Sequence, residues 1–371
     1  MDGENLVTWL SRSLQGNPPE LVNCAPETFR ELIRLADWHG ITPLLYHQLQ
    51  QAGQLDGIPA LLRDALISSH YQAIAATLAS AQELGRVIAL LNTNGFDYIL
   101  FKGTPLSWTL YPAAHLRARC DTDILFPDKN SALRAAGLIR EIGYQTADAI
   151  TGDFVMTQLC CYKTSKSGFL HNLDCHWKIN NHPYFSDRIS FDEIQLTAMT
   201  LSSPGQARYP SPVYSLLVAC LHRVAHIPDG IADRLIWLYD IHLLINTFNE
   251  QQLNELVQRA IQKGLAAVCL DGMLKAQQFL GTRIEPVILE RLQQHADDTF
   301  FKPHYQQSPW RYTLDQFRAL PGWRARLKLL RENLFPPVAY IQKKYATSNP
   351  LLLPYYYLLR VIQGLPKLMG R

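Results

Sequence analysis

Charged residues are scarce in this sequence: Asp, Glu, Lys and Arg make up 18% of its 371 residues, and the formal net charge is only +3. A dedicated DNA-binding protein carries a stronger basic footprint, and a disordered or coiled-coil chain carries more charge. Nucleic acid is therefore possible as a substrate but is not the default partner. With 47% hydrophobic residues the chain should fold as a globule, and its length predicts two or three packed units.

Paired cysteine spacings and a secretory leader are both missing. The seven cysteines are scattered singly apart from Cys160-Cys161, without a CxxC spacing, which favours reduced thiols over a disulfide framework. The first residues, MDGENLVTWLSRSLQ, contain neither a basic n-region nor an apolar core, so they do not predict a signal peptide. We expect a cytoplasmic protein.

No apolar run is long enough to predict a transmembrane helix. The most apolar stretch, Leu351 to Leu359, is interrupted by Pro354 and closed by Arg360, well short of the roughly 20 residues that a span needs. The tail through Arg371 is apolar and basic, so weak contact with a membrane surface is possible. Docking of this tail on the protein core is the favoured interpretation.

The two ends of the chain have helical periodicity. Apolar residues recur at three- and four-residue steps over 27–51 and over 63–93, before the stop signal Asn94-Gly95, which predicts an N-terminal helical region over 1–95. Beyond residue 205 a C-terminal helical region over 206–371 is predicted. Its expected helices cover 213–225, 235–248, 251–263 and 265–280, followed by shorter helices separated by prolines.

In the middle segment, 96–205, the apolar residues no longer follow the helical period throughout. Short apolar runs predict strands over 98–101 and 121–126, with Gly103 in the turn after the first and a helix capped by Thr104. A helix is expected over 130–142, and a hairpin with strands over 154–162 and 169–179. The predicted fold class is α+β: a small mixed sheet flanked by helical regions.

Three aspartates in this segment suggest a metal-dependent transferase. Asp121 and Asp123 are two residues apart on an expected strand, so their side chains share one face, and Asp174 lies in a later apolar strand. Carboxylates placed together can hold the divalent metals that nucleotidyl transfer requires. Gly103 and Thr104, at a strand-to-helix turn, could cradle a phosphate with backbone N–H groups.

The stretch YILFKGTPLSWTLYPAAHLRARCDTDILF, followed by NLDCHWKI, resembles the uncharacterised nucleotidyltransferase family of the polymerase-β-like superfamily. The family's Lys-Gly, Tyr-Pro, Arg and Asp-x-Asp segments are matched by Lys102-Gly103, Tyr111-Pro112, Arg117 and Asp121 to Asp123. Weaker likeness extends over most of the chain. The resemblance implies transfer of NMP from an NTP such as ATP to a hydroxyl, with Asp121, Asp123 and Asp174 holding Mg²⁺ or Mn²⁺ and pyrophosphate released.

Basic residues near the aspartates are candidates for triphosphate binding. Arg117 and Arg119 precede the carboxylates on an expected loop, where a guanidinium could grip phosphate. Lys102 could do the same or pair with Asp121.

Histidines are possible supporting residues. His222 and His226 lie one helical turn apart, which can suit zinc, but packing or a hydrogen bond to Asp240 is favoured. Strand alternation sends Asp174 and His176 to one face, while Cys175 should face the core.

The acceptor is not predicted: a small metabolite, an antibiotic-like compound, a glycan precursor, a tRNA end and a protein side chain all remain. Two other functions also stay open. A catalytically silent nucleotide-binding or partner module would keep the fold without the reaction, and a metal-dependent phosphohydrolase would use the same aspartates with nearby histidines.

Overall fold

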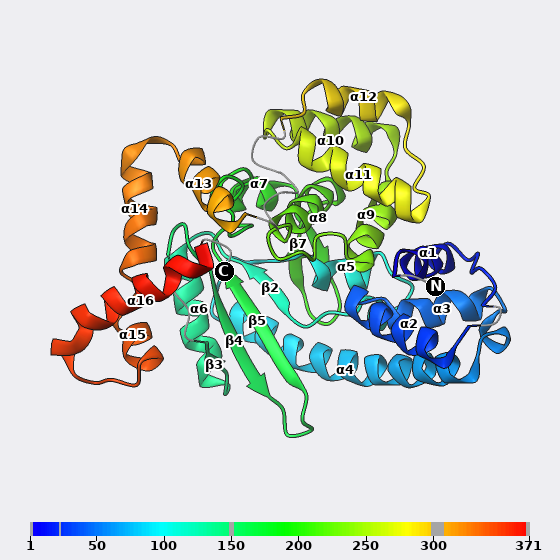
Figure 1. Ribbon diagram of the computed structural model, residues 1–371, viewed down its shortest axis with the longest axis horizontal. Coiled ribbons are helices and arrows are strands. Elements are labelled where there is room, and N and C mark those ends of the chain that lie inside the picture. Colours follow the sequence, from blue (N-terminus) through cyan, green and yellow to red (C-terminus); the bar gives the residue numbers. More distant parts are fainter. Residues whose placement is uncertain (1–2, 22–23, 148–151, 298–307, 369–371) are drawn as a thin grey trace.

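The computed structural model describes residues 3–21, 24–147, 152–297 and 308–368. It is an α+β protein, as predicted, with a five-stranded mixed sheet between two groups of helices (Figure 1). The N-terminal group contains α1 (Gly3–Leu14), α2 (Pro26–His39), α3 (Thr42–Gln51) and the long α4 (Ala60–Thr93). Helix α2 ends at Gly40, which adopts the left-handed conformation (φ 70°) that glycine tolerates best.

The sheet has the strand order β1-β2-β5-β4-β3. Its strands are β1 (Ile99–Phe101), β2 (Thr122–Leu125), β3 (Gln145–Thr146), β4 (Gln158–Thr164) and β5 (Leu170–His176). All neighbouring pairs are antiparallel except β2 and β5, which run parallel. Helix α5 (Gly103–Thr109) follows β1, and α6 (Lys129–Glu141) follows β2. Asp128 caps α6 by accepting a hydrogen bond from the Ser131 N–H at 2.8 Å.

The predicted hairpin is present, but its strands are shorter than expected. The first begins at Gln158 rather than Phe154 because the backbone N–H groups of Asp153, Phe154 and Val155 donate to the carboxylate of Glu332, far along the chain. These amides are therefore not available to a strand ladder. The second strand ends at His176 rather than Ile179.

Among the described residues after β5, the only strands form a two-stranded ribbon. Helix α7 (Phe191–Leu196) precedes the ribbon, which pairs β6 (Met199–Leu201) with β7 (Ala207–Tyr209). A compact helical layer follows, and its members match the predicted helices to within one residue at each end: α8 (Pro212–Ala225), α9 (Leu235–Thr247), α10 (Glu250–Gln262), α11 (Ala266–Leu280), with α12 (Pro286–Gln294) after them.

The apolar cores cross the region boundaries expected at residues 95 and 205. The C-terminal half of α4 packs with the sheet and α6 in one cluster. Buried residues of α9, from Leu235 to Tyr239, share a cluster with the N-terminal helices. The division into three regions stays a prediction, but the cores tie these regions together.

The last helices lie on the side of the sheet away from the N-terminal helices, at the left of Figure 1. They are α13 (Pro309–Ala319), α14 (Gly322–Leu334), α15 (Val338–Lys344) and α16 (Leu353–Leu368). Tyr355, Leu358 and Ile362 of α16 are exposed. Contact of this tail with a membrane surface stays a prediction.

Helix α4 is the one described helix whose length and composition would suffice to cross a membrane. Core helices of soluble proteins can have the same length and composition. The expectation that no segment spans a membrane stays a prediction.

Candidate active site

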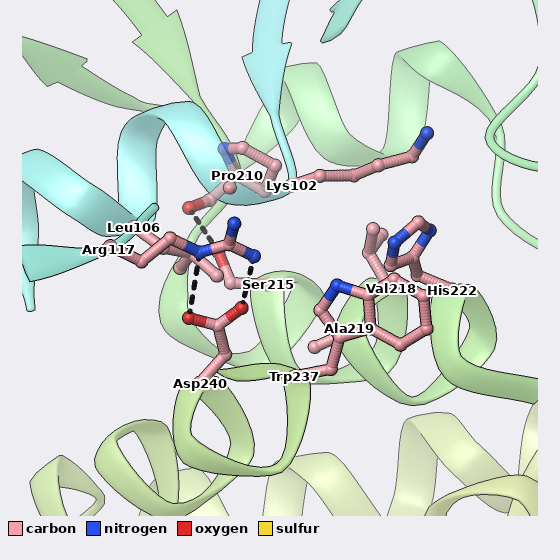
Figure 2. Close-up of a pocket in the computed structure, with 11 residues that line it drawn as sticks. Lys102, Leu106, Arg117, Pro210, Ser215, Val218, Ala219, His222, Trp237 and Asp240 are labelled. Atoms are coloured by element: carbon pink, nitrogen blue, oxygen red, sulfur yellow. Dashed lines mark hydrogen bonds and ion pairs between the residues drawn. The ribbon is translucent and has the colours of Figure 1, made fainter. Parts of the chain in front are cut away.

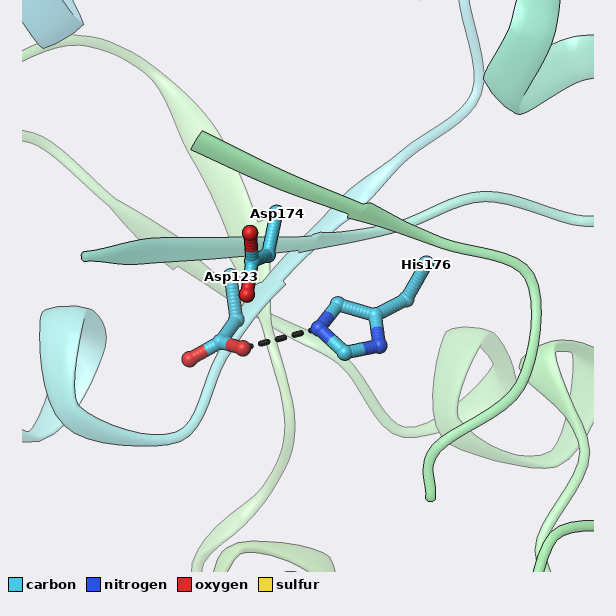
Figure 3. Close-up of side chains that lie close together, drawn as sticks. All are labelled: Asp123, Asp174 and His176. Carbon is cyan, nitrogen blue, oxygen red and sulfur yellow. Dashed lines mark hydrogen bonds and ion pairs between the residues drawn. The ribbon is translucent and has the colours of Figure 1, made fainter. Parts of the chain in front are cut away.

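The register of the parallel strands β2 and β5 places two aspartates side by side. Asp123 is the register partner of Asp174, and Leu125 is the partner of His176. Since neighbouring residues in register point to the same face of a sheet, both carboxylates face one cleft with His176 beside them (Figure 3). Ligand atoms of Asp123, Asp174 and His176 all lie within 4.8 Å of one another.

Lys102 brings a positive charge into this cluster. Its Nζ donates to Asp123 Oδ1 at 2.6 Å, and His176 Nε2 lies 2.8 Å from the same oxygen. Lys102 is one of two described residues other than glycine with a positive φ, here 57°. Such a conformation costs on the order of 1–3 kcal/mol and persists where surrounding structure enforces it. The strained turn between β1 and α5 thus aims an ammonium at the carboxylates.

The surroundings shift the pKa values of the two aspartates in the Asp-x-Asp segment in opposite directions. Burial pushes the pKa of Asp123 upward, but the Lys102 ammonium and the His176 hydrogen bond outweigh it and hold this pKa below its usual value. Burial, followed by repulsion from Asp123, raises the pKa of Asp121 to about 6. Asp121 lines the same cleft, one residue before the start of β2.

Asp174 is held by neutral groups instead. Gln158 Nε2 donates to Asp174 Oδ2 at 2.6 Å, and Gln158 Oε1 accepts a hydrogen bond from Asn181 Nδ2 at 2.9 Å. Asn181 Oδ1 is in turn bonded to the backbone N–H of Thr157 at 2.8 Å. This series of hydrogen bonds fixes the orientation of the Asp174 carboxylate without neutralising its charge. Asp174 does not accept a hydrogen bond from His171, which lies on the opposite face of β5.

These side chains line a cleft of 470 Å³, within the range of about 300–1,000 Å³ common for small-molecule sites. Lys102, Asp121, Asp123, Asp174 and His176 lie at its sheet wall. Cys175 is fully buried on the other face, as alternation predicts.

The position of Arg117 differs from the expectation of a loop residue that reaches phosphate. Its guanidinium is buried and paired with Asp240: Nη2 lies 2.7 Å from Oδ2, and Nε lies 3.3 Å from Oδ1 (Figure 2). The Tyr111 hydroxyl donates to the same carboxylate at 2.7 Å. Arg117 therefore lies outside the 470 Å³ cleft, and a role in nucleotide binding stays a prediction.

The buried guanidinium of Arg117 leaves no room for a side chain at Gly103. A Cβ at position 103 would lie 2.7 Å from Arg117 Nη1, so a side chain there would force the guanidinium aside. The phosphate cradle expected of Gly103 and Thr104 receives no support from the side chain of Thr104. That hydroxyl is buried and donates to Thr122 Oγ1 at 3.3 Å.

Arg119 also points away from the cleft. Its Nη1 donates to Ser107 Oγ at 3.1 Å, and the residue lines a separate cavity on the other side of the sheet. Burial, followed by repulsion from Arg117, lowers the pKa of Arg119 to about 10.

His222 and His226 pack against an aromatic residue, His222 edge-on and His226 stacked, rather than bonding to Asp240. Their rings lie 4.6 and 5.1 Å from that of Trp237, between centroids. His226 Nδ1 is 3.0 Å from Asp229 Oδ2. Both histidines line the cleft, and burial holds the pKa of His222 well below its usual value.

Two contributors to the site were missed from sequence. Gln158 carries no recognisable motif, and only the strand pairing of β4 with β5 shows that it reaches Asp174. The second is the pair of helices α13 and α14, whose residues Tyr312, Gln316, Leu329 and Asn333 line the cleft opposite the sheet. The i, i+4 spacing of the two lining residues on each helix is a sequence signal that could have identified a shared face.

Two comparisons with known proteins find similarity to this chain. A model of the family described as "Uncharacterised nucleotidyltransferase" matches residues 25–281. Among solved structures, the chain is similar to an antigenic nucleotidyltransferase-like protein from Paracoccidioides brasiliensis, with 15% identity. That match covers 57% of this chain and 97% of that chain, with a TM-score of 0.34. A search of curated proteins found no match.

Proposed function

Because the chain belongs to the uncharacterised nucleotidyltransferase family, we propose that it transfers a nucleoside monophosphate from an NTP to an acceptor hydroxyl. The observation that carries this proposal is the register pairing of Asp123 with Asp174, with His176 alongside, at the wall of a cleft. Carboxylates arranged in this way suit the metal-assisted displacement of pyrophosphate.

The residues present fit a divalent metal. Asp123 and Asp174 offer hard oxygen donors, which Mg²⁺ and Mn²⁺ prefer, and the nearby imidazole of His176 is also tolerated by Mn²⁺. The Lys102 ammonium lies at 2.6 Å from Asp123, which shows that this position already attracts a cation. A bound metal would supply charge neutralisation at the phosphates and a lowered pKa for the acceptor hydroxyl.

Lys102 is also expected to contact the triphosphate. A metal at Asp123 would compete with the ammonium for Oδ1, so Lys102 would be released toward the anionic triphosphate. This exchange matters because Lys102 is the one lysine or arginine among the described residues that line the cleft. Arg117 and Arg119 are engaged elsewhere. Triphosphate binding should therefore depend strongly on the metal.

Gln158 is expected to orient one of the metal-binding carboxylates. Gln158 holds Asp174 in place by donating to its Oδ2. In the reaction, the acceptor oxygen forms a bond to the α-phosphorus and the bond to the bridging oxygen of the β-phosphate breaks. Pyrophosphate leaves with that electron pair, and the hydroxyl proton passes to solvent.

The test is incubation of the purified protein with ATP, CTP, GTP or UTP labelled at the α-phosphate, together with cell extract and Mg²⁺ or Mn²⁺. Transfer places the label on an acceptor and releases unlabelled pyrophosphate. Hydrolysis leaves the label on free nucleotide, and a silent module leaves the NTP intact. Metal-independent turnover, or turnover that survives Asp123→Asn, would refute the proposal.

A further inference from the structure

Part of the lining of the cleft comes from a segment of the chain outside the family match. The match ends at residue 281, whereas Tyr312 and Gln316 of α13 and Leu329 and Asn333 of α14 line the cleft. Each pair is spaced i, i+4, so each helix presents one face to the cavity. The family core thus supplies the metal-binding wall, and the C-terminal helices add lining that is available for selecting an acceptor.

These C-terminal helices are fixed in place over the cleft. The Glu332 carboxylate accepts hydrogen bonds from the backbone N–H groups of Asp153, Phe154 and Val155 at 2.9, 3.0 and 3.2 Å. Phe154 and Val155 themselves line the cleft. The Tyr312 ring lies 5.3 Å from that of His182, between centroids. The second wall is therefore attached directly to the margin of the site.

The lining away from the metal cluster is polar but largely uncharged. It includes the amide side chains of Gln316 and Asn333, while those of Asn180 and Asn181 are already hydrogen-bonded within the protein. Burial lowers the pKa of His182 to about 4, so this histidine is neutral at physiological pH. Asp229, the acidic group at this end, lies 3.0 Å from His226 Nδ1.

The chemistry of this wall excludes an acceptor that depends on phosphate contacts. Proteins that hold nucleic acid use several lysines or arginines on the backbone phosphates. In the part of the chain that the structure describes, this cleft offers only Lys102, which the nucleotide itself would engage. Amides, which donate and accept hydrogen bonds, suit hydroxyl groups, and the rings of Phe154 and Tyr312 offer flat apolar surface.

We propose that the acceptor is a small, neutral, polyhydroxylated molecule of the sugar or polyol class, selected by the α13–α14 face that carries Tyr312, Gln316 and Asn333. This inference rests on the proposed nucleotidyl transfer and adds the class of acceptor and the residues that select it. The cleft volume of 470 Å³ suits small molecules rather than a folded nucleic acid.

The test uses the full-length protein, α-labelled NTP and Mg²⁺ with four sets of probes. One is a panel of neutral sugars and polyols of one to three rings or equivalent chain length. The others are sugar phosphates, aminoglycosides and a short RNA with a free 3′ hydroxyl. The label should appear on a neutral probe.

Gln316→Ala and Asn333→Ala should each raise the KM for that probe about tenfold or more, corresponding to roughly 1.4 kcal/mol, while Mg-NTP affinity stays within twofold of wild type. Gln342→Ala, an amide deletion on α15 away from the cleft, is the matched control.

Transfer mainly to RNA, sugar phosphates or aminoglycosides would overturn the proposal. So would transfer to no neutral probe while Mg-NTP binding is intact, or unchanged KM values in both variants. Failure of the underlying transferase function is distinguishable, because it would abolish metal-dependent NTP binding or turnover in the wild type with every probe and with cell extract.

Discussion

At the scale of single residues, Asp123 and Asp174 are adjacent but differ in what contacts their charge. Asp123 has the Lys102 ammonium and His176 on one oxygen, whereas Asp174 has the neutral amide of Gln158. The charge of Asp174 is therefore the one more available to a metal that activates the acceptor hydroxyl.

Asp174→Asn should separate binding from chemistry. It preserves side-chain size, and its amide can still bond to Gln158, but the charge is lost. We expect near-normal Mg-NTP affinity and transfer reduced at least about a hundredfold, roughly 2.7 kcal/mol of barrier. Melting temperature, NTP affinity and turnover should be measured on one preparation. A lower melting temperature with retained turnover would mean that Asp174 is only a hydrogen-bond acceptor within the hairpin.

Lys102→Met tests whether the ammonium stands in for a metal. Without the lysine, Asp123 loses its nearest positive charge, so Mn²⁺ should bind more tightly and raise the melting temperature more than in wild type. Mg-NTP affinity should fall, because the cleft then has no lysine or arginine among its described residues. Titration calorimetry with Mn²⁺ alone and with Mn-NTP measures both effects. Weaker Mn²⁺ binding would contradict this role.

Arg117→Ala should lower the stability of the fold. The Arg117 and Asp240 side chains are only 8% and 4% exposed, and removing one partner of a buried ion pair costs about 3–5 kcal/mol. Replacing both partners, as Arg117→Met with Asp240→Leu, should cost less, because no unpaired charge remains. Denaturant unfolding measures the difference. Normal stability with lost NTP affinity would restore the phosphate-binding role predicted from sequence.

At the scale of elements, single hydrogen bonds connect helices that are far apart in sequence. His39, at the end of α2, accepts a hydrogen bond at Nδ1 from the backbone N–H of Leu235 at 3.1 Å, at the start of α9. Burial, followed by repulsion from Arg234, lowers the pKa of His39 to about 4 from 6.5. Protonation would remove the acceptor and place a charge in the core.

This geometry predicts a pH-dependent stability contribution. The unfolded chain binds a proton below pH 6.5 and the folded chain only near pH 4, so the contribution is complete above pH 6.5 and is lost as the pH falls toward 4. The loss attributable to His39 should be about 2 kcal/mol between pH 7 and pH 5. His39→Asn keeps a non-titrating acceptor, so its stability should fall less over the same range in urea unfolding. An identical pH profile would exclude His39 as the source.

At the scale of the whole molecule, Glu332 connects the C-terminal helices to the margin of the active site. Glu332→Ala should release α13 and α14 from residues 153–155, since charge-assisted hydrogen bonds contribute about 1.5–3 kcal/mol each. Hydrogen–deuterium exchange should therefore accelerate about tenfold or more across 153–155 and 309–334, with α8 to α11 unchanged. Glu290→Ala, at an exposed position of α12, is the matched control. Unchanged exchange would mean that other contacts hold these helices.

Local sequence patterns determined most of the elements by themselves. The 3.6-residue period identified the helices of α4 and of α8 to α11, and the apolar runs after residue 97 identified every strand of the sheet except β3, because burial of one face imposes these periods on any sequence. The membership of Asp123 and Asp174 in those strands, and the α+β class, followed from the same local information.

Only the tertiary structure decided what each polar group contacts. Sequence spacing does not specify that Arg117 pairs with Asp240 across 123 residues, or that Lys102 meets Asp123 rather than Asp121. It also does not specify that the amides at 153–155 bond to Glu332 instead of extending β4. These partners lie on different elements, and their choice depends on strand register and helix packing, which arise from the sum of many long-range contacts. The fold class was therefore encoded locally, whereas the composition of the cleft was set by the packing of the whole chain.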